Sequence, residues 1–137
     1  MKILSSRTEN MTPSLTVAID TLAKKMKAEG KDIVSLGAGE PDLNTPTAIC
    51  KAGIDAILAG KLRYTAPTGI LEVREAVSHK LMRDNHLTYN ADHIIMTSGA
   101  KHAVFNALAA LINPGDEIII PSPYWVTYPE LVKWMGG

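Results

Sequence analysis

The stretch His93-Ile94-Ile95-Met96-Thr97-Ser98-Gly99-Ala100-Lys101 decides the fold class of this chain. It opens with an apolar run of strand length and passes through Ser-Gly into a helical pattern. The turn Asn113-Pro114-Gly115-Asp116 then leads to a second apolar run, Glu117-Ile118-Ile119-Ile120. Strands that are apolar at every position and alternate with helices are typical of a parallel sheet covered on both faces. The sequence therefore predicts an α/β fold.

Further helical patterns surround these two runs. Two of them follow Thr12-Pro13 and Thr45-Pro46, where Thr can cap a helix and Pro is tolerated at the next position. We expect these helices to end at Gly30 and Gly60, with a short strand at residues 32–36 between them. Other helices are expected over residues 128–134 and along two apolar faces, Ile70, Val73, Val77, Leu81 and Ala100, Ala103, Val104, Ala107, Leu108, Leu111.

The predicted sheet is incomplete. The strand–helix–strand stretch supplies two strands, and the chain ends at Met135-Gly136-Gly137, where a helix stop should lead into another strand. A parallel sheet needs more strands than this to cover its helices and to pair its edges. We therefore expect these residues to belong to a larger domain.

Composition excludes several classes of function. The 137 residues carry 14 Lys+Arg and 14 Asp+Glu, so a formal net charge of +0 gives no attraction for nucleic acid or an anionic membrane. The one cysteine, Cys50, excludes an internal disulfide and lies on an apolar helical stripe, where we expect a core residue in a cytoplasmic protein. A metal site is not expected, because the four histidines lack ligand spacing: His79, His86, His93 and His102.

Two segments follow the main strands, where open parallel sheets bind ligands. Between strand and helix, Gly99 lets a ligand approach the backbone, and the start of the helix is suited to an anion such as phosphate. An equally good interpretation is that Ser98 caps the helix. After the next strand, the prolines of Pro121-Ser122-Pro123-Tyr124-Trp125 stiffen the chain, so Trp125 could serve as a platform for a flat ring or fill the core beneath the loop. If both ends share one crevice, a ring that carries a phosphate fits them.

Two other features are similar to familiar motifs. Gly37-Ala38-Gly39 follows a strand, but the third glycine of a dinucleotide site is missing and Pro41 interrupts the expected helix. The loop is therefore either a sharp turn or a place where a substrate carboxylate approaches the backbone. Lys101 begins a helix, so we interpret it as a backbone contributor or a solvated side chain and not as a Schiff-base lysine.

Four segments in this order resemble successive landmarks of class I aminotransferases, enzymes that use pyridoxal 5'-phosphate (PLP), and are most similar to the bacterial aspartate aminotransferases. The segments are Ser35-Leu36-Gly37-Ala38-Gly39-Glu40-Pro41-Asp42, Tyr64-Thr65-Ala66-Pro67-Thr68-Gly69, Thr97-Ser98-Gly99-Ala100-Lys101 and Pro121-Ser122-Pro123-Tyr124-Trp125-Val126-Thr127-Tyr128-Pro129. The resemblance implies the PLP-dependent transferase fold of type I. It also implies two domain segments, residues 1–46 as an N-terminal arm with the start of a small domain and residues 47–137 as the first part of a large cofactor domain.

The resemblance also implies roles for single residues. The backbone N–H groups of Gly99, Ala100 and Lys101 would bind the PLP phosphate. Trp125 would stack on the ring and border the substrate, and Gly39 would contact the substrate α-carboxylate. Tyr64 would reach the phosphate of the neighbouring subunit, which implies a homodimer with shared sites.

The residues that perform the chemistry in this family come later in its sequences, including the Schiff-base lysine, so no catalytic residue can be assigned in this chain. The resemblance implies a transaminase that moves an amino group between an amino acid such as aspartate and a 2-oxo acid. Two alternatives remain. The protein could be another PLP enzyme of the same fold, such as a C–S lyase or a cyclase, or these residues could form a non-catalytic fragment that binds partners.

Overall fold

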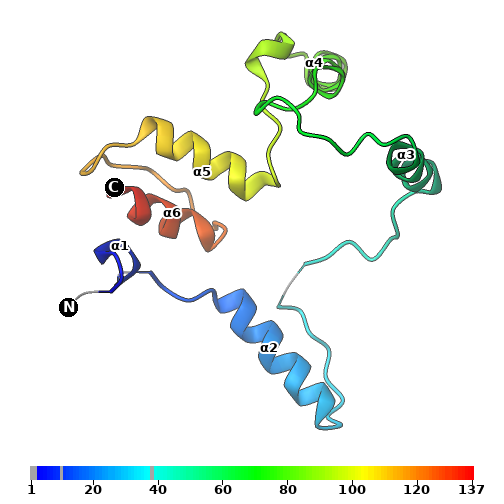
Figure 1. Ribbon diagram of the computed structural model, residues 1–137. Helices are drawn as coiled ribbons and strands as arrows, with labels where there is room; N and C mark the ends of the chain where they lie inside the picture. The colour runs from blue at the N-terminus through cyan, green and yellow to red at the C-terminus, as the bar shows by residue number, and fades with distance from the viewer. Residues whose placement is uncertain (1–2, 10, 38) are drawn as a thin grey trace. The chain divides into compact units, whose positions relative to one another are not determined.

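The computed structural model describes residues 3–9, 11–37 and 39–137 (Figure 1). Their regular structure is helical, and the elements follow in the order α1 (Ser6–Glu9), α2 (Leu15–Ala28), α3 (Thr47–Leu58), α4 (Leu71–Asn85), the 3-10 helix η1 (Ala91–His93), α5 (Ala100–Leu111) and α6 (Thr127–Met135). Each long helical pattern of the sequence corresponds to one of these helices.

Contacts divide the chain into two compact units. One unit comprises Met1–Pro41 and Val104–Gly137, and the other comprises Asp42–Ala103. The second boundary therefore falls in the first turn of α5. The domain division predicted by resemblance, residues 1–46 and 47–137, concerns the whole protein and stays a prediction.

No strand is present among the described residues. Residues 32–36 and 117–120 are neither helix nor strand, and η1 takes up His93 before the irregular segment 94–97. A strand requires a neighbouring segment that pairs with its N–H and C=O groups. The side chain of Ile119 in the second run is 93% exposed, so this run is not covered by a packed layer either. The parallel sheet thus stays a prediction.

The helices begin slightly later than the sequence predicts. Ser14, and not Thr12, caps α2 by accepting the Val17 N–H, while Pro46 occupies the cap position of α3 without a side-chain hydrogen bond. Thr12 lies outside the helix, and its own N–H donates to Glu130 Oε2 at 2.9 Å. Local capping patterns therefore locate a helix start to within one or two residues.

The helix ends agree with the prediction. Gly30 and Gly60 adopt positive φ angles of 80° and 69°, a conformation that other residues rarely adopt. After α2, Gly30 N–H donates to Lys27 O and Lys31 N–H donates to Met26 O, which is the Schellman arrangement. The same pair of hydrogen bonds follows α3, so both helices end at their glycines.

Burial is sparse in the described part of the chain. Ala23 and Ile94 are its buried hydrophobic residues, whereas α3 buries none of its side chains. Cys50 is exposed, so the expectation that it is a core residue is wrong for this chain. The apolar stripe is present on α3, but its side chains are exposed in the described part of the chain. None of the helices found in these residues is long and apolar enough to cross a bilayer.

Candidate functional site

The turn before α5 places a helix start next to an open glycine. Gly99 has a φ of +84°, and a Cβ added there would meet no heavy atom within 4 Å. Its carbonyl accepts hydrogen bonds from Ala103 N–H and Thr97 Oγ1, so the hydrogen bonding of the helix begins at this residue. The first N–H groups of any helix lack carbonyl partners within it and carry partial positive charge. An anion can therefore approach the start of α5 from the Gly99 side.

One of the three amides that were predicted to act together takes part in a hydrogen bond within the turn. Gly99 N–H donates to Thr97 O at 2.9 Å, so an anion would have to compete for it. Ala100 and Lys101 are the first two residues of α5. Helix N–H groups at this end point away from the helix, so Gly99, Ala100 and Lys101 all stay candidates for anion contacts through the backbone.

Ser98 does not have the position of a helix cap. It precedes α5 by two residues, and its backbone N–H donates to His102 Nδ1 at 3.2 Å. This bond makes Nδ1 an acceptor, so the proton of a neutral His102 ring lies on Nε2. The role of His102 as a partner of this loop was not predicted from the sequence. Its spacing of four residues from Ser98, on the first turn of a helix, is the signal that could have identified it.

The segment with Tyr64 is joined to the segment with Gly99 inside the same unit. Met96 N–H donates to Thr68 O at 3.0 Å, and a Cβ added at Gly69 would lie 2.7 Å from Met96 Cγ. Only glycine fits there without displacing Met96, and its φ of +93° also favours glycine. The turn that ends at Gly69 therefore supports the chain three residues before Gly99. Tyr64, at the beginning of this turn, has a fully exposed side chain.

The other two predicted site residues belong to the first unit. Trp125 is 45% exposed, which speaks against the interpretation that it fills a core beneath its loop. Its carbonyl accepts the Tyr128 N–H at the start of α6, and the preceding Ser122–Pro123 peptide bond is cis. A Cβ added at Gly39 would meet no heavy atom within 4 Å, so the backbone there is open to a ligand. Ala38, the middle residue of its motif, lies outside the described residues.

The predicted site residues thus fall into two groups. Tyr64, Gly99, Ala100 and Lys101 belong to one unit, whereas Gly39 and Trp125 belong to the other. The meeting of Gly99 and Trp125 in one crevice stays a prediction.

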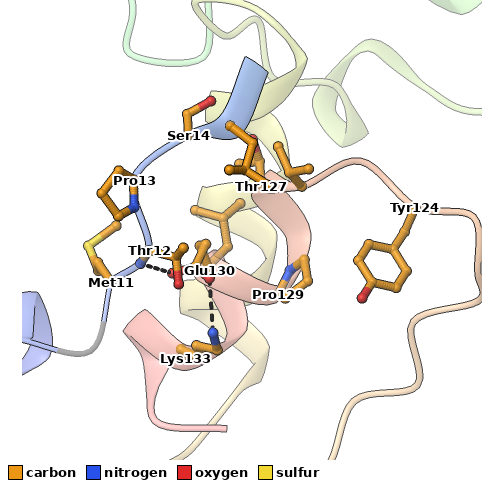
Figure 2. Close-up of a pocket in the computed structure, with 12 residues that line it drawn as sticks. Met11, Thr12, Pro13, Ser14, Tyr124, Thr127, Pro129, Glu130 and Lys133 are labelled. Carbon is orange, nitrogen blue, oxygen red and sulfur yellow. Dashed lines mark hydrogen bonds and ion pairs between the residues drawn. The ribbon is translucent and has the colours of Figure 1, made fainter. Parts of the chain in front are cut away.

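A hollow of about 690 Å³ lies between the N-terminal segment and α6 of the first unit (Figure 2). Its lining is mainly apolar and includes Met11, Pro13, Leu15, Tyr124, Val126 and Leu131. Glu130 joins the two walls, because it accepts the Thr12 N–H and the Lys133 ammonium, each at 2.9 Å. The hydrogen bond from the Thr12 amide lowers the pKa of the Glu130 carboxyl most, and the hydrogen bond from Lys133 is the second cause. Arg7 adds a contact to α6, with its guanidinium 5.4 Å from the Trp134 ring centroid.

Comparison with known proteins identifies the class. The family model described as aminotransferase class I and II matches residues 31–137. That match covers more than half of the chain. The chain therefore belongs to the class I and II aminotransferase family.

Individual relatives are similar over the whole chain. A probable aspartate/prephenate aminotransferase of Rhizobium leguminosarum bv. phaseoli is 47% identical over 137 residues, which are 100% of this chain and 34% of that protein. An aspartate aminotransferase of Bacillus sp. (strain YM-2) is 47% identical over 136 residues, covering 99% of this chain and 35% of that protein.

A solved structure extends the similarity to the fold. The aspartate aminotransferase of Thermus thermophilus with maleate superposes with a TM-score of 0.96 at 45% identity, covering 100% of this chain and 36% of that one. The chain thus has the fold of a part of PLP-dependent aminotransferases. It spans about a third of the length of the relatives that it matches.

Proposed function

We propose that the whole protein is a PLP-dependent aminotransferase that exchanges an amino group between aspartate and a 2-oxo acid. The observation that carries this proposal is the open Gly99 turn at the start of α5, in a chain of the aminotransferase family. Aspartate is supported by the names of the relatives and by the maleate in the Thermus thermophilus structure. Maleate and aspartate are both four-carbon dicarboxylates.

The start of α5 fits the phosphate ester of PLP. The space beside Gly99 is open, and the dipole of a helix of twelve residues favours a negative charge at its N-terminus. We assign the phosphate contacts to the backbone N–H groups of Gly99, Ala100 and Lys101, with the open side of Gly99 providing access and its N–H contributing once its bond to Thr97 opens. Ser98 and His102 hold the turn through their hydrogen bond.

The remaining residues would orient the ring and the substrate. When bound, PLP withdraws electrons from the substrate α-carbon and so supplies the chemistry of the reaction. The exposed face of Trp125 would stack on the ring and limit its rotation, and the open backbone at Gly39 would bind the substrate α-carboxylate. The fully exposed Tyr64 would reach the phosphate bound by a second subunit, so we propose a homodimer. We also propose that the protein is cytoplasmic.

These 137 residues by themselves should not catalyse the reaction. The family pattern places the lysine that binds PLP covalently, and the residues that tune the ring, in segments that this chain does not contain. For this polypeptide alone, a non-catalytic role in binding other subunits is the candidate function. The many exposed apolar side chains on α2 and α3 favour that role.

The test is spectroscopic and chemical. The whole protein, purified with PLP, should be yellow, and its spectrum should change on addition of aspartate. With aspartate and 2-oxoglutarate it should form glutamate, and prephenate is the second acceptor to assay. A C–S lyase or another eliminating enzyme would instead release pyruvate and ammonia. A colourless protein that does not respond to added PLP would contradict the proposal.

A further inference from the structure

Arg74, on the first turn of α4, has a side chain that is largely enclosed within the second unit, with 13% of its surface exposed. Nε donates to Gly69 O at 3.3 Å, and Nη1 donates to Ala91 O at 2.8 Å. Asp92 is near, with 3.5 Å between its Oδ1 and Nη1, but the Asp92 side chain is 91% exposed. The guanidinium therefore serves mainly to join two backbone carbonyls.

These carbonyls lie in the two segments that support the entry to the Gly99 turn. Gly69 and its neighbour Thr68 contact Met96, through close packing and through the hydrogen bond from Met96 N–H. Ala91 begins η1, and its carbonyl also accepts the N–H of the buried Ile94. Arg74 thus holds both sides of residues 94–96, which lead directly to Thr97 and Gly99.

We propose that Arg74 is a positioning residue for the phosphate of PLP, acting through Met96 on the backbone amides at the start of α5. This inference rests on the proposed function. The planar guanidinium can donate to both carbonyls at once, whereas a lysine ammonium on a flexible stem holds them less firmly. Without the guanidinium, the turn at Gly69 can move away from η1. The amides after Met96 then lose their fixed direction. Preorganised donors of this kind account for much of the affinity of a charged group.

The test compares PLP with pyridoxal, which has the same ring but no phosphate. The dissociation constant of each compound is measured by absorbance on the whole apoprotein, for the wild type and for Arg74→Gln and Arg74→Lys. We expect Arg74→Gln to weaken PLP by about 10- to 100-fold, the range seen when groups that orient a site are removed. Pyridoxal binding should stay unchanged, and Arg74→Lys should give an intermediate loss.

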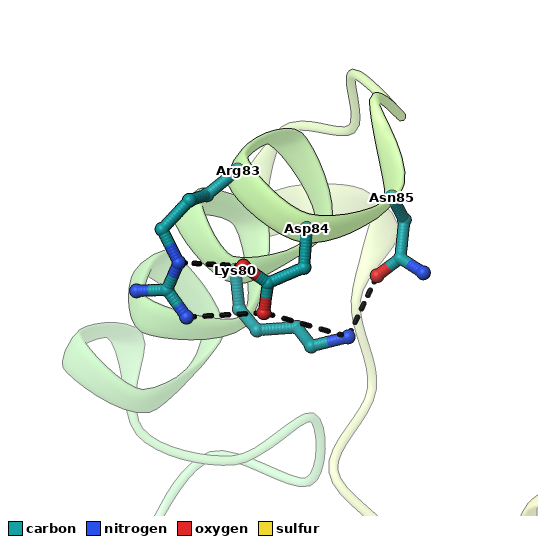
Figure 3. Close-up of polar contacts among 4 residues, drawn as sticks. All are labelled: Lys80, Arg83, Asp84 and Asn85. Atoms are coloured by element: carbon teal, nitrogen blue, oxygen red, sulfur yellow. Dashed lines mark hydrogen bonds and ion pairs between the residues drawn. The ribbon is translucent and has the colours of Figure 1, made fainter.

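The control is Arg83→Gln at the other end of α4. Arg83 is 74% exposed and binds Asp84 of its own helix at 2.7 Å, in a surface cluster with Lys80 and Asn85 (Figure 3). Its replacement should leave both dissociation constants unchanged. Gly69→Ala is a second route to the same effect, because the added Cβ displaces Met96 and strains the turn whose carbonyl Arg74 binds, while the arginine itself is kept.

The outcomes distinguish the inference from the function on which it rests. The role of Arg74 would be overturned if the ratio of the two dissociation constants stayed unchanged in Arg74→Gln, Arg74→Lys and Gly69→Ala. This holds whether the variants weaken both compounds equally or weaken neither. If Arg74→Gln does not fold, the ratio measured for Arg74→Lys and Gly69→Ala decides the question. A wild-type protein that binds neither compound would refute the proposed function itself.

Discussion

Single charged side chains hold distant parts of each unit together. Glu130 accepts a hydrogen bond from Thr12, which is 118 positions away in the sequence, and Arg74 joins segments on both sides of α4. Sequence reasoning did not single out either residue, because a charge on an amphipathic helix normally faces solvent. Their roles depend on carbonyl and amide groups whose positions follow only from the folded chain.

The contact at Glu130 should weaken in acid. Its pKa is lowered from the ordinary value of 4.5 by the Thr12 amide first and by Lys133 second. Since the folded form favours the carboxylate, the stabilisation is fully present above the ordinary pKa and disappears as the pH falls through the lowered one. Hydrogen exchange of the Thr12 amide in the whole protein, measured between about pH 7 and about pH 3, should show protection lost at the acid end.

Variants test whether Glu130 is the group responsible. Glu130→Gln can still accept from Thr12 but loses the ion pair, so we expect weaker protection that no longer depends on pH. Asp84→Asn is the matched control, because Arg83 lowers the pKa of that exposed carboxyl, which belongs to the other unit. An acid transition at Thr12 that persists in Glu130→Gln would show that another group controls it.

At the scale of elements, the helices follow from local patterns, whereas the strands do not. Residues 100–111 were predicted as a helix from their apolar face and form α5. Helical hydrogen bonds join residues four apart, so a local pattern contains most of the information. The apolar run at residues 117–120 forms no strand in the described chain, since its partners must come from elsewhere in the sequence.

One glycine lies within α3 and another follows its end. Replacing each by alanine should change the free energy of unfolding in opposite directions. Gly53 lies in the helix interior with no heavy atom within 4 Å of an added Cβ, so Gly53→Ala should stabilise by about 0.5–1 kcal/mol. Gly60 has a φ of +69°, and Gly60→Ala should destabilise because alanine is strained there. Denaturant unfolding of the whole protein measures both changes. A shift in the same direction for both variants would mean that α3 does not have these boundaries.

The whole chain exposes much more apolar surface than a stable domain does. Leu36, Leu58 and Ile119 are each at least 80% exposed, while Ala23 and Ile94 are the described hydrophobic residues that are buried. Chains that expose many large apolar side chains tend to associate with partners or aggregate. The exposed surface is consistent with a chain that spans about a third of the length of its relatives.

Expressed alone, these 137 residues should behave as a loosely packed fragment. We expect strong binding of a hydrophobic dye, a broad thermal transition and no transfer of amino groups from aspartate to 2-oxoglutarate, because little apolar area is buried. The whole protein serves as the control and should unfold cooperatively with little dye binding. A sharp transition without dye binding, or measurable transaminase turnover by the fragment, would contradict this expectation.

The sequence by itself determined the long helices, the glycine ends of α2 and α3 and the family, because each depends on local spacing or on motifs in a fixed order; the residues assigned to the cofactor stay a prediction. Only the tertiary structure decided which groups support those residues. The bonds from Ser98 to His102, from Met96 to Thr68 and from Arg74 to Gly69 and Ala91 each have at least one backbone atom as a partner. Apart from the missing N–H of proline, every residue carries the same backbone carbonyl and amide, so no pattern of side chains reveals which of them will meet.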